Sequence, residues 1–194
     1  MEKETLIQLA YTFFPKGLSY DDKLIFESSK EFRHLVEVTS QSEELSRKWH
    51  SLLNVFQRLG YSIEEIGYEE RPPRSFRIAI RKKGTLFPFI VVTMSKLIPF
   101  FSLYSIAEKY DFSESDSPVL FQNFSIKERE ISNEIEGLIR SEFTEFDIFP
   151  ADLINVEVED IEYGELGIVK SKTDGYFFTP MTLYNVYFAN FLFY

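Results

Sequence analysis

The sequence predicts an α+β protein with N-terminal helices, an antiparallel β-meander, one long amphipathic helix that packs on the sheet, and an aromatic C-terminal element. Apolar residues recur at helical spacing before residue 60 and again before residue 143. They alternate or run together between residues 76 and 106, and nine aromatic residues lie between residues 176 and 194. Helices and strands in separate stretches of a chain are typical of the α+β class. Because no repeat or low-complexity linker interrupts the sequence, we predict a single domain spanning residues 1–194.

Three helices are predicted before residue 60. Residues 2–14 place apolar side chains at three- and four-residue intervals, and Pro15 ends the run. Residues 28–31 and 40–43 both have the spacing of a capping box, so a helix is expected to begin at each. Gly60 stands where the residue after a helix C-cap belongs. The last of the three helices has the clearest apolar stripe, formed by Leu45, Trp49, Leu52, Leu53, Phe56 and Leu59.

Strands are predicted after Gly60, where the period of the pattern changes. Residues 63–66 form a short run that is compatible with an extended chain. Apolar residues then alternate with basic ones or alanine over residues 76–81, which predicts a half-buried strand. A turn at residues 82–85 leads to a central apolar strand at 86–94. A third strand is expected within residues 96–106, and the order of these strands predicts a meander.

The second half begins with a polar loop at residues 110–124, and residues 125–128 have capping-box spacing. They open a helix with an apolar face formed by Ile131, Ile135, Leu138, Ile139 and Phe143. A short strand is expected at residues 168–169. The aromatic residues 176–194 fit either a strand or a short helix, because their spacing is compatible with both periods.

The net charge of −10 is unevenly distributed along the sequence. Residues 1–97 hold 15 basic and 13 acidic side chains, whereas residues 98–194 hold 6 basic and 18 acidic ones. A basic stretch runs through residues 71–83, and the acids are densest between residues 157 and 165. Such asymmetry produces a field that can steer a charged partner. Two interpretations remain open: the acidic half is a solvated surface, or it faces a basic partner.

The residue types that carry most catalytic chemistry are scarce. The chain has no cysteine, and its two histidines, His34 and His50, both lie on predicted helices. No phosphate-binding glycine loop, nucleophile elbow or metal-ligand spacing is present. We therefore predict no catalytic residue, no metal and no cofactor, and a protein that is not an enzyme. A carboxylate-dependent hydrolase stays open as an alternative, because acids are plentiful and the sequence does not place them in space.

Arg74, Arg77 and Arg81 give a second alternative, a regulatory or nucleic-acid-associated module that uses the basic strand. Arg77 and Arg81 would share the strand face opposite the apolar residues. The net negative charge opposes binding to a polyanion, and the acidic half of the chain can pair with this strand internally. Nucleic acid is therefore not an expected partner.

The apolar runs are too short to cross a membrane. Residues 86–92 and 97–101 are the longest of them, against the roughly 20 residues that a spanning helix needs. The N-terminus is charged and lacks the apolar run of a secretory signal. We therefore expect a cytoplasmic protein that makes no use of a membrane.

Two segments carry a resemblance to a known group of proteins. Ser95-Lys-Leu-Ile-Pro-Phe-Phe101 and Met181-Thr-Leu-Tyr-Asn-Val-Tyr-Phe188, with the general build of the chain, resemble small bacterial proteins encoded beside polymorphic toxins as immunity proteins. No functional residue carries over from this resemblance. It implies a stoichiometric cytosolic binder that blocks a toxin. Proteins of this kind are often acidic and need no catalytic residues of their own.

The predicted function is a non-enzymatic acidic binding protein that occludes a basic toxin domain. Acidic side chains would speed the encounter, and aromatic side chains would anchor the complex. The tyrosines could instead belong to the core. The predicted partner-binding residues are Glu157, Glu159, Asp160, Glu162, Glu165, Tyr184 and Tyr187.

Overall fold

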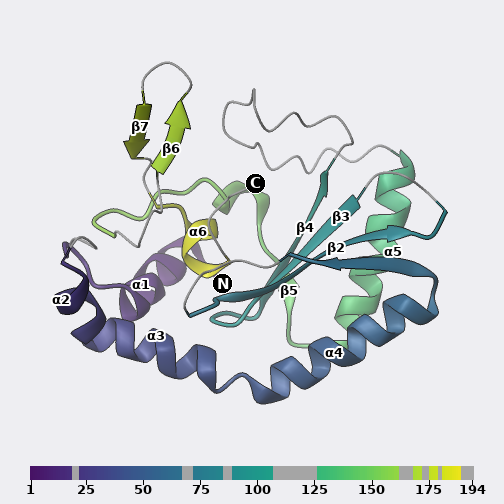
Figure 1. Cartoon of the computed structure of the whole chain (residues 1–194), viewed down its shortest axis with the longest axis horizontal. Coiled ribbons are helices and arrows are strands. Elements are labelled where there is room, and N and C mark those ends of the chain that lie inside the picture. The colour runs from purple at the N-terminus through teal and green to yellow at the C-terminus, as the bar shows by residue number, and fades with distance from the viewer. Residues whose placement is uncertain are drawn as a thin grey trace. The chain divides into compact units, whose positions relative to one another are not determined.

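The computed structural model describes residues 1–18, 22–66, 72–84, 89–106, 126–161, 168–171, 175–178 and 181–188. Helices and a five-stranded sheet are both present, so the predicted α+β class is confirmed. The chain forms two compact units (Figure 1). The helical unit comprises Met1–Gln41 and Pro150–Leu192, and the sheet unit comprises Ser42–Phe149 with Phe193–Tyr194. The prediction of one domain over residues 1–194 stays a prediction.

The sheet unit is built on the predicted meander, which is confirmed. Strands β1 (Tyr61–Glu65), β2 (Ser75–Lys82), β3 (Phe89–Ser95) and β4 (Phe100–Ile106) pair antiparallel in chain order. A fifth strand, β5 (Asp147–Ile148), pairs parallel to β4 and was not predicted. With two residues, β5 is too short to show an alternating pattern in the sequence.

Two helices of the sheet unit share one core with one face of the sheet. They are α4 (Glu43–Arg58) and α5 (Ile126–Glu142), and most of the two predicted apolar stripes is confirmed as buried or partly buried. The exception is Leu59, which was predicted on the first stripe and is 51% exposed just after α4. Register brings Ile78, Val92 and Leu103 side by side across the three central strands. All three side chains are in this core, together with Trp49 and Phe56 of α4. The long helix therefore packs on the sheet as expected.

The opposite face of the sheet is more apolar than predicted. Ala79, expected on an outward face beside two arginines, is buried. It lies across from Val91 on β3, which in turn lies across from Tyr104 on β4, and the three form a small second cluster. Alanine adds little to a sequence pattern because its side chain is small, so the neighbours on the adjacent strands decide its burial.

Two helix starts differ from the capping-box prediction. Helix α3 (Lys30–Ser40) is capped by Ser29, whose hydroxyl accepts a hydrogen bond from the amide of Phe32, so the prediction of Ser28 was wrong by one residue. Ser40 ends α3 and its hydroxyl donates to the carbonyl of Glu37. Helix α4 begins at Glu43 after Ser42. Ser/x/x/Glu spacing recurs by chance in polar stretches. The spacing therefore placed the boundaries between helices within a few residues but did not identify the N-cap residues.

Gly60 follows α4 as predicted. Its φ of +82° lies in the left-handed region, which glycine adopts without the steric cost that a Cβ imposes. Its amide donates to the carbonyl of Gln57, and its carbonyl accepts from the amide of Lys83. The glycine thus turns the chain from α4 into β1.

The helical unit combines an N-terminal segment of the chain with a segment from its C-terminal part. Helix α1 (Lys3–Phe13) packs against α3 and against α6 (Leu183–Tyr187). A short helix, α2 (Lys23–Ser28), was not predicted, and it lies directly before α3. The remaining elements are η1 (Ala151–Leu153) and a hairpin of β6 (Ile168–Ser171) with β7 (Gly175–Phe178). The aromatic C-terminal segment therefore contains both a strand and a helix, the two forms that its spacing left open.

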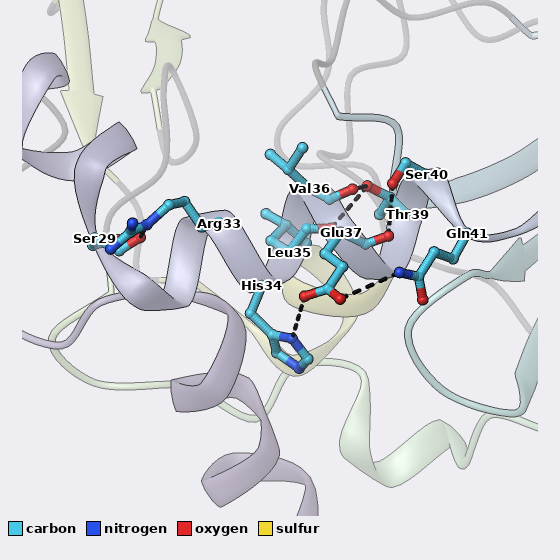
Figure 2. A network of polar contacts seen from close by, with 9 residues as sticks. All are labelled: Ser29, Arg33, His34, Leu35, Val36, Glu37, Thr39, Ser40 and Gln41. Carbon is cyan, nitrogen blue, oxygen red and sulfur yellow. Dashed lines mark hydrogen bonds and ion pairs between the residues drawn. The ribbon is translucent and has the colours of Figure 1, made fainter.

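Helix α3 carries a polar network on its surface (Figure 2). The Glu37 carboxylate accepts a hydrogen bond from Nε2 of Gln41 at 3.2 Å and lies 4.0 Å from Nδ1 of His34. The His34 ring also stacks on Phe13 of α1, with ring centroids 5.2 Å apart. These contacts account for His34 as a helix-surface residue. Among the described residues, no helix is long and apolar enough to cross a membrane.

Candidate partner-binding surface

The acidic segment, which we define as residues 157–161, alternates between exposed and buried side chains. Glu157, Glu159 and Asp160 are exposed, whereas Val158 and Ile161 are buried. The two apolar side chains thus fix the segment to the helical unit and leave its carboxylates in solvent. Glu162 and Glu165 lie outside the described residues.

Backbone hydrogen bonds hold the acidic segment against α6. The amide of Val158 donates to the carbonyl of Met181 at 2.7 Å, and the amide of Leu183 donates to the carbonyl of Val156 at 2.8 Å. Glu157 forms an isolated antiparallel bridge with Thr182, the N-cap of α6. The carboxylates of the segment therefore project from a backbone whose position is set by its neighbours.

A second set of contacts ties the segment to the C-terminal end of α1. The Tyr11 hydroxyl donates to the carbonyl of Glu159 at 3.2 Å, and the Gly17 amide donates to the carbonyl of Asp160 at 2.7 Å. Asp160 has a φ of 56°, a left-handed conformation that aspartate tolerates better than most residues. Its carboxylate pairs with Lys16 at 3.6 Å, but both side chains are more than half exposed, so this ion pair adds little stability.

Tyr184 and Tyr187 are buried in the helical unit. The Tyr187 hydroxyl donates a hydrogen bond to the carbonyl of Leu6 in α1, and the Tyr184 ring stacks on Phe188 at 4.7 Å between centroids. Burial raises the pKa of the Tyr187 phenol. In this structure the two rings therefore belong to the core that supports the acidic segment, and neither offers its face to a partner.

Grouped by compact unit, the net charge is more evenly distributed than between the two halves of the chain, which carry +2 and −12. The helical unit holds 14 acidic and 7 basic side chains, a net of −7, and the sheet unit holds 17 acidic and 14 basic ones, a net of −3. Each unit combines residues from both halves of the chain, because residues 1–41 fold with residues 150–192. The unit that contains the acidic segment therefore carries most of the net negative charge, although the sheet unit holds more acidic side chains.

Two ion pairs of the sheet unit join basic side chains from the first half of the chain to acidic side chains from the second half. Lys82 of β2 pairs with Glu134 of α5 at 2.9 Å, and Lys48 of α4 pairs with Glu145 at 3.3 Å. Each lysine comes from residues 1–97, and each glutamate comes from the acidic residues 98–194. The interpretation that the basic strand pairs internally is confirmed for Lys82.

The three arginines considered for nucleic-acid binding do not form one exposed face. Arg74 is 0% exposed, Arg77 is half-buried, and Arg81 lies 3.8 Å from Glu64 with its guanidinium over the Phe89 ring. A buried guanidinium cannot reach a phosphate. The described part of β2 therefore offers a smaller basic surface than its sequence suggested.

Among the described residues, the carboxyl groups with clear pKa shifts all lie in the sheet unit, and all have lowered pKa values. A hydrogen bond from Lys82 lowers the pKa of Glu134, and one from Arg140 lowers the pKa of Asp147. For Glu145, a backbone hydrogen bond is the largest cause of the lowered pKa, and a hydrogen bond from Lys48 lowers the pKa further. A general acid needs a raised pKa. These carboxylates are accounted for as ion-pair partners.

Asp147→Asn is expected to reduce the acid sensitivity of the sheet unit. Arg140 contacts Asp147 at 2.6 Å and lowers the pKa of its carboxyl. A lowered folded-state pKa contributes stability above the ordinary aspartate pKa of about 3.9, and this is lost as the pH falls through the folded value. The variant should therefore lose less stability than the wild type between pH 5 and pH 2. Urea unfolding across this range measures the effect, with the exposed Asp152→Asn as control. If the free energy of unfolding falls with pH as steeply in Asp147→Asn as in the wild type, the prediction is contradicted.

Among the described residues, no group of three His, Asp or Glu side chains gathers closely enough to hold a metal ion. Comparison with protein-family models gives no match, and neither do comparisons with curated proteins and with solved structures. The fold and the candidate surface together define an α+β protein with an exposed acidic segment on a strongly negative helical unit.

Proposed function

We propose that this chain is a non-enzymatic acidic binding protein of the immunity type, which occludes a basic toxin domain in the cytoplasm. The observation that carries the proposal is the acidic segment. Its carboxylates are exposed while its backbone is bonded on one side to α6 and on the other to the end of α1. A fixed row of charges loses little conformational entropy on binding, which favours association.

The proposed mechanism is electrostatic steering followed by steric blocking. The net charge of −7 on the helical unit would attract a basic domain from a distance and raise the association rate. Contacts from Glu157 and Glu159 would then fix the orientation of the partner. No chemical step is required of this chain, because covering the active surface of a toxin is sufficient to stop it.

Reversing two charges in the acidic segment is expected to slow association. Glu157→Lys with Glu159→Lys should lower the association rate constant about tenfold at low salt and flatten its dependence on ionic strength. Asp160 is left in place because its left-handed backbone disfavours lysine. The measurement is stopped-flow association with the basic partner that co-purifies from the native host.

The matched control makes the same change of net charge in the sheet unit. Glu65 and Glu130 are exposed, and Glu65→Lys with Glu130→Lys shifts the charge of the chain equally. This control should retain most of the wild-type rate at physiological salt. Equal slowing by both double variants would mean that only net charge matters, and an unchanged rate in the first variant would refute the proposed surface.

The two alternatives receive no specific support. A carboxylate-dependent hydrolase would be favoured by paired acids with raised pKa values, and the resolved shifts in Glu134, Glu145 and Asp147 go the other way. A nucleic-acid-associated module would be favoured by an exposed basic strand, and Arg74 is buried. The acidic binding protein is therefore the function we propose.

A further inference from the structure

Helix α2 exposes apolar side chains on its outward side. Leu24 is 86% exposed and Ile25 is 57% exposed, whereas Phe26 is fully buried and meets the Phe32 ring edge-on at 5.6 Å between centroids. Consecutive helical residues are about 100° apart around the axis, so Leu24 lies nearly opposite Phe26 and Ile25 lies between them, next to Leu24. Helix α2 thus carries apolar side chains both on its buried side and on its exposed side.

The rim of this apolar pair is charged. Lys23 and Glu27 form an ion pair at 3.7 Å along α2, and Asp22 is exposed at the start of the helix. An apolar centre with a polar rim is the usual composition of a protein–protein interface. The exposed pair therefore has the chemical character of an interface anchor.

The chain path keeps α2 close to the acidic segment. The Gly17 amide binds the carbonyl of Asp160, and Asp22 follows Gly17 by five residues. Five residues span at most about 18 Å even when fully extended. The start of α2 therefore lies within that distance of Gly17, and one protein partner of ordinary size can cover both features.

The charge of the helical unit favours a basic protein partner over a second copy of the chain as the occupant of this surface. A second copy of the chain would bring another helical unit of net charge −7 against the first. Like charges facing each other oppose association, whereas a basic partner gains from the same field. We propose that Leu24 and Ile25 form the apolar anchor of the docking surface for a basic protein partner, which also covers the acidic segment. This inference rests on the proposed function.

The test uses a synthetic amphipathic helical peptide with one leucine face and one lysine face, and fluorescence anisotropy as the measurement. Leu24→Ser with Ile25→Ser is expected to weaken binding at least about tenfold, the typical effect of removing an interface anchor. Leu59→Ser is the matched control, because Leu59 is a 51% exposed leucine of the sheet unit. This control should bind as the wild type does, and circular dichroism should show all variants folded.

A second peptide separates apolar docking from general attraction to lysine. Its composition is the same but its sequence is scrambled, so that it has no apolar face. It should bind the wild type more weakly, and the serine substitutions in α2 should not change its affinity. If both peptides respond equally to these substitutions, or neither does, the anchor is refuted.

Further outcomes distinguish this inference from the proposed function. Glu157→Lys with Glu159→Lys should also weaken the binding of the amphipathic peptide. If it does not, while the α2 variant does, then α2 binds without the acidic segment and both the shared docking surface and the proposed function fail. If only the α2 variant is without effect, the anchor alone is wrong. Two results would overturn the choice of a basic protein partner. The first is sedimentation of the wild type as a dimer and of the α2 variant as a monomer. The second is binding of the wild type, but not of the α2 variant, to phosphatidylcholine–phosphatidylserine vesicles, with no binding to the peptide.

Discussion

Phe56→Ala is expected to lower the free energy of unfolding by about 3–5 kcal/mol. Phe56 is fully buried in the core between α4 and the sheet, and its ring meets the Tyr61 ring edge-on at 5.8 Å between centroids. Truncation removes the apolar contact area and leaves a cavity that a close-packed interior fills only in part. Chemical denaturation followed by circular dichroism measures the loss.

The neighbouring position supplies the control for this substitution. Gln57 is exposed on the same turn of α4, and Gln57→Ala should change the stability by no more than about 0.5 kcal/mol. A comparable loss in both variants would show that the helix itself is sensitive there. A loss below about 1 kcal/mol for Phe56→Ala would contradict the packing of α4 on the sheet.

The elements that the sequence predicted best are those with long apolar stripes. Helix α4 and helix α5 each bury several residues on one face, so their period stands out against the polar background. Strands β2 to β4 were predicted from alternation and from a continuous apolar run. Helix α2 was missed because Leu24 and Ile25 face solvent, which removes the contrast between faces on which periodicity depends.

The candidate surface was predictable only in part. The exposed acids of the segment follow from its composition, and the spacing of Val158 and Ile161 was the signal that it is attached to a core. Tyr187 is buried against a distant part of the chain, where its hydroxyl donates a hydrogen bond to Leu6, 181 residues away in the sequence. No local pattern reports such a contact. For the same reason, charge counted by halves of the chain did not show that the helical unit holds most of the net charge.

Leu35→Ala is expected to lower the free energy of unfolding by about 2–5 kcal/mol, and its effect tests the prediction of a single domain. Leu35 is fully buried on α3, in the helical unit. Trp49 is the one tryptophan of the chain and is buried in the sheet unit, where it stacks on Phe76. Its fluorescence therefore reports on the unit that does not contain the substitution.

If residues 1–194 unfold as one cooperative domain, the Leu35→Ala variant should shift the Trp49 fluorescence transition as far as the circular dichroism transition, because coincident probes are the mark of two-state unfolding. Val36→Ala is the matched control, since this neighbour on α3 is 42% exposed and alanine favours the helix. An unshifted Trp49 transition together with an early second transition in circular dichroism would show instead that the two units unfold independently. The acidic surface would then belong to a unit that can lose its structure while the sheet unit stays folded, and partner binding would be lost at a lower denaturant concentration than the Trp49 signal.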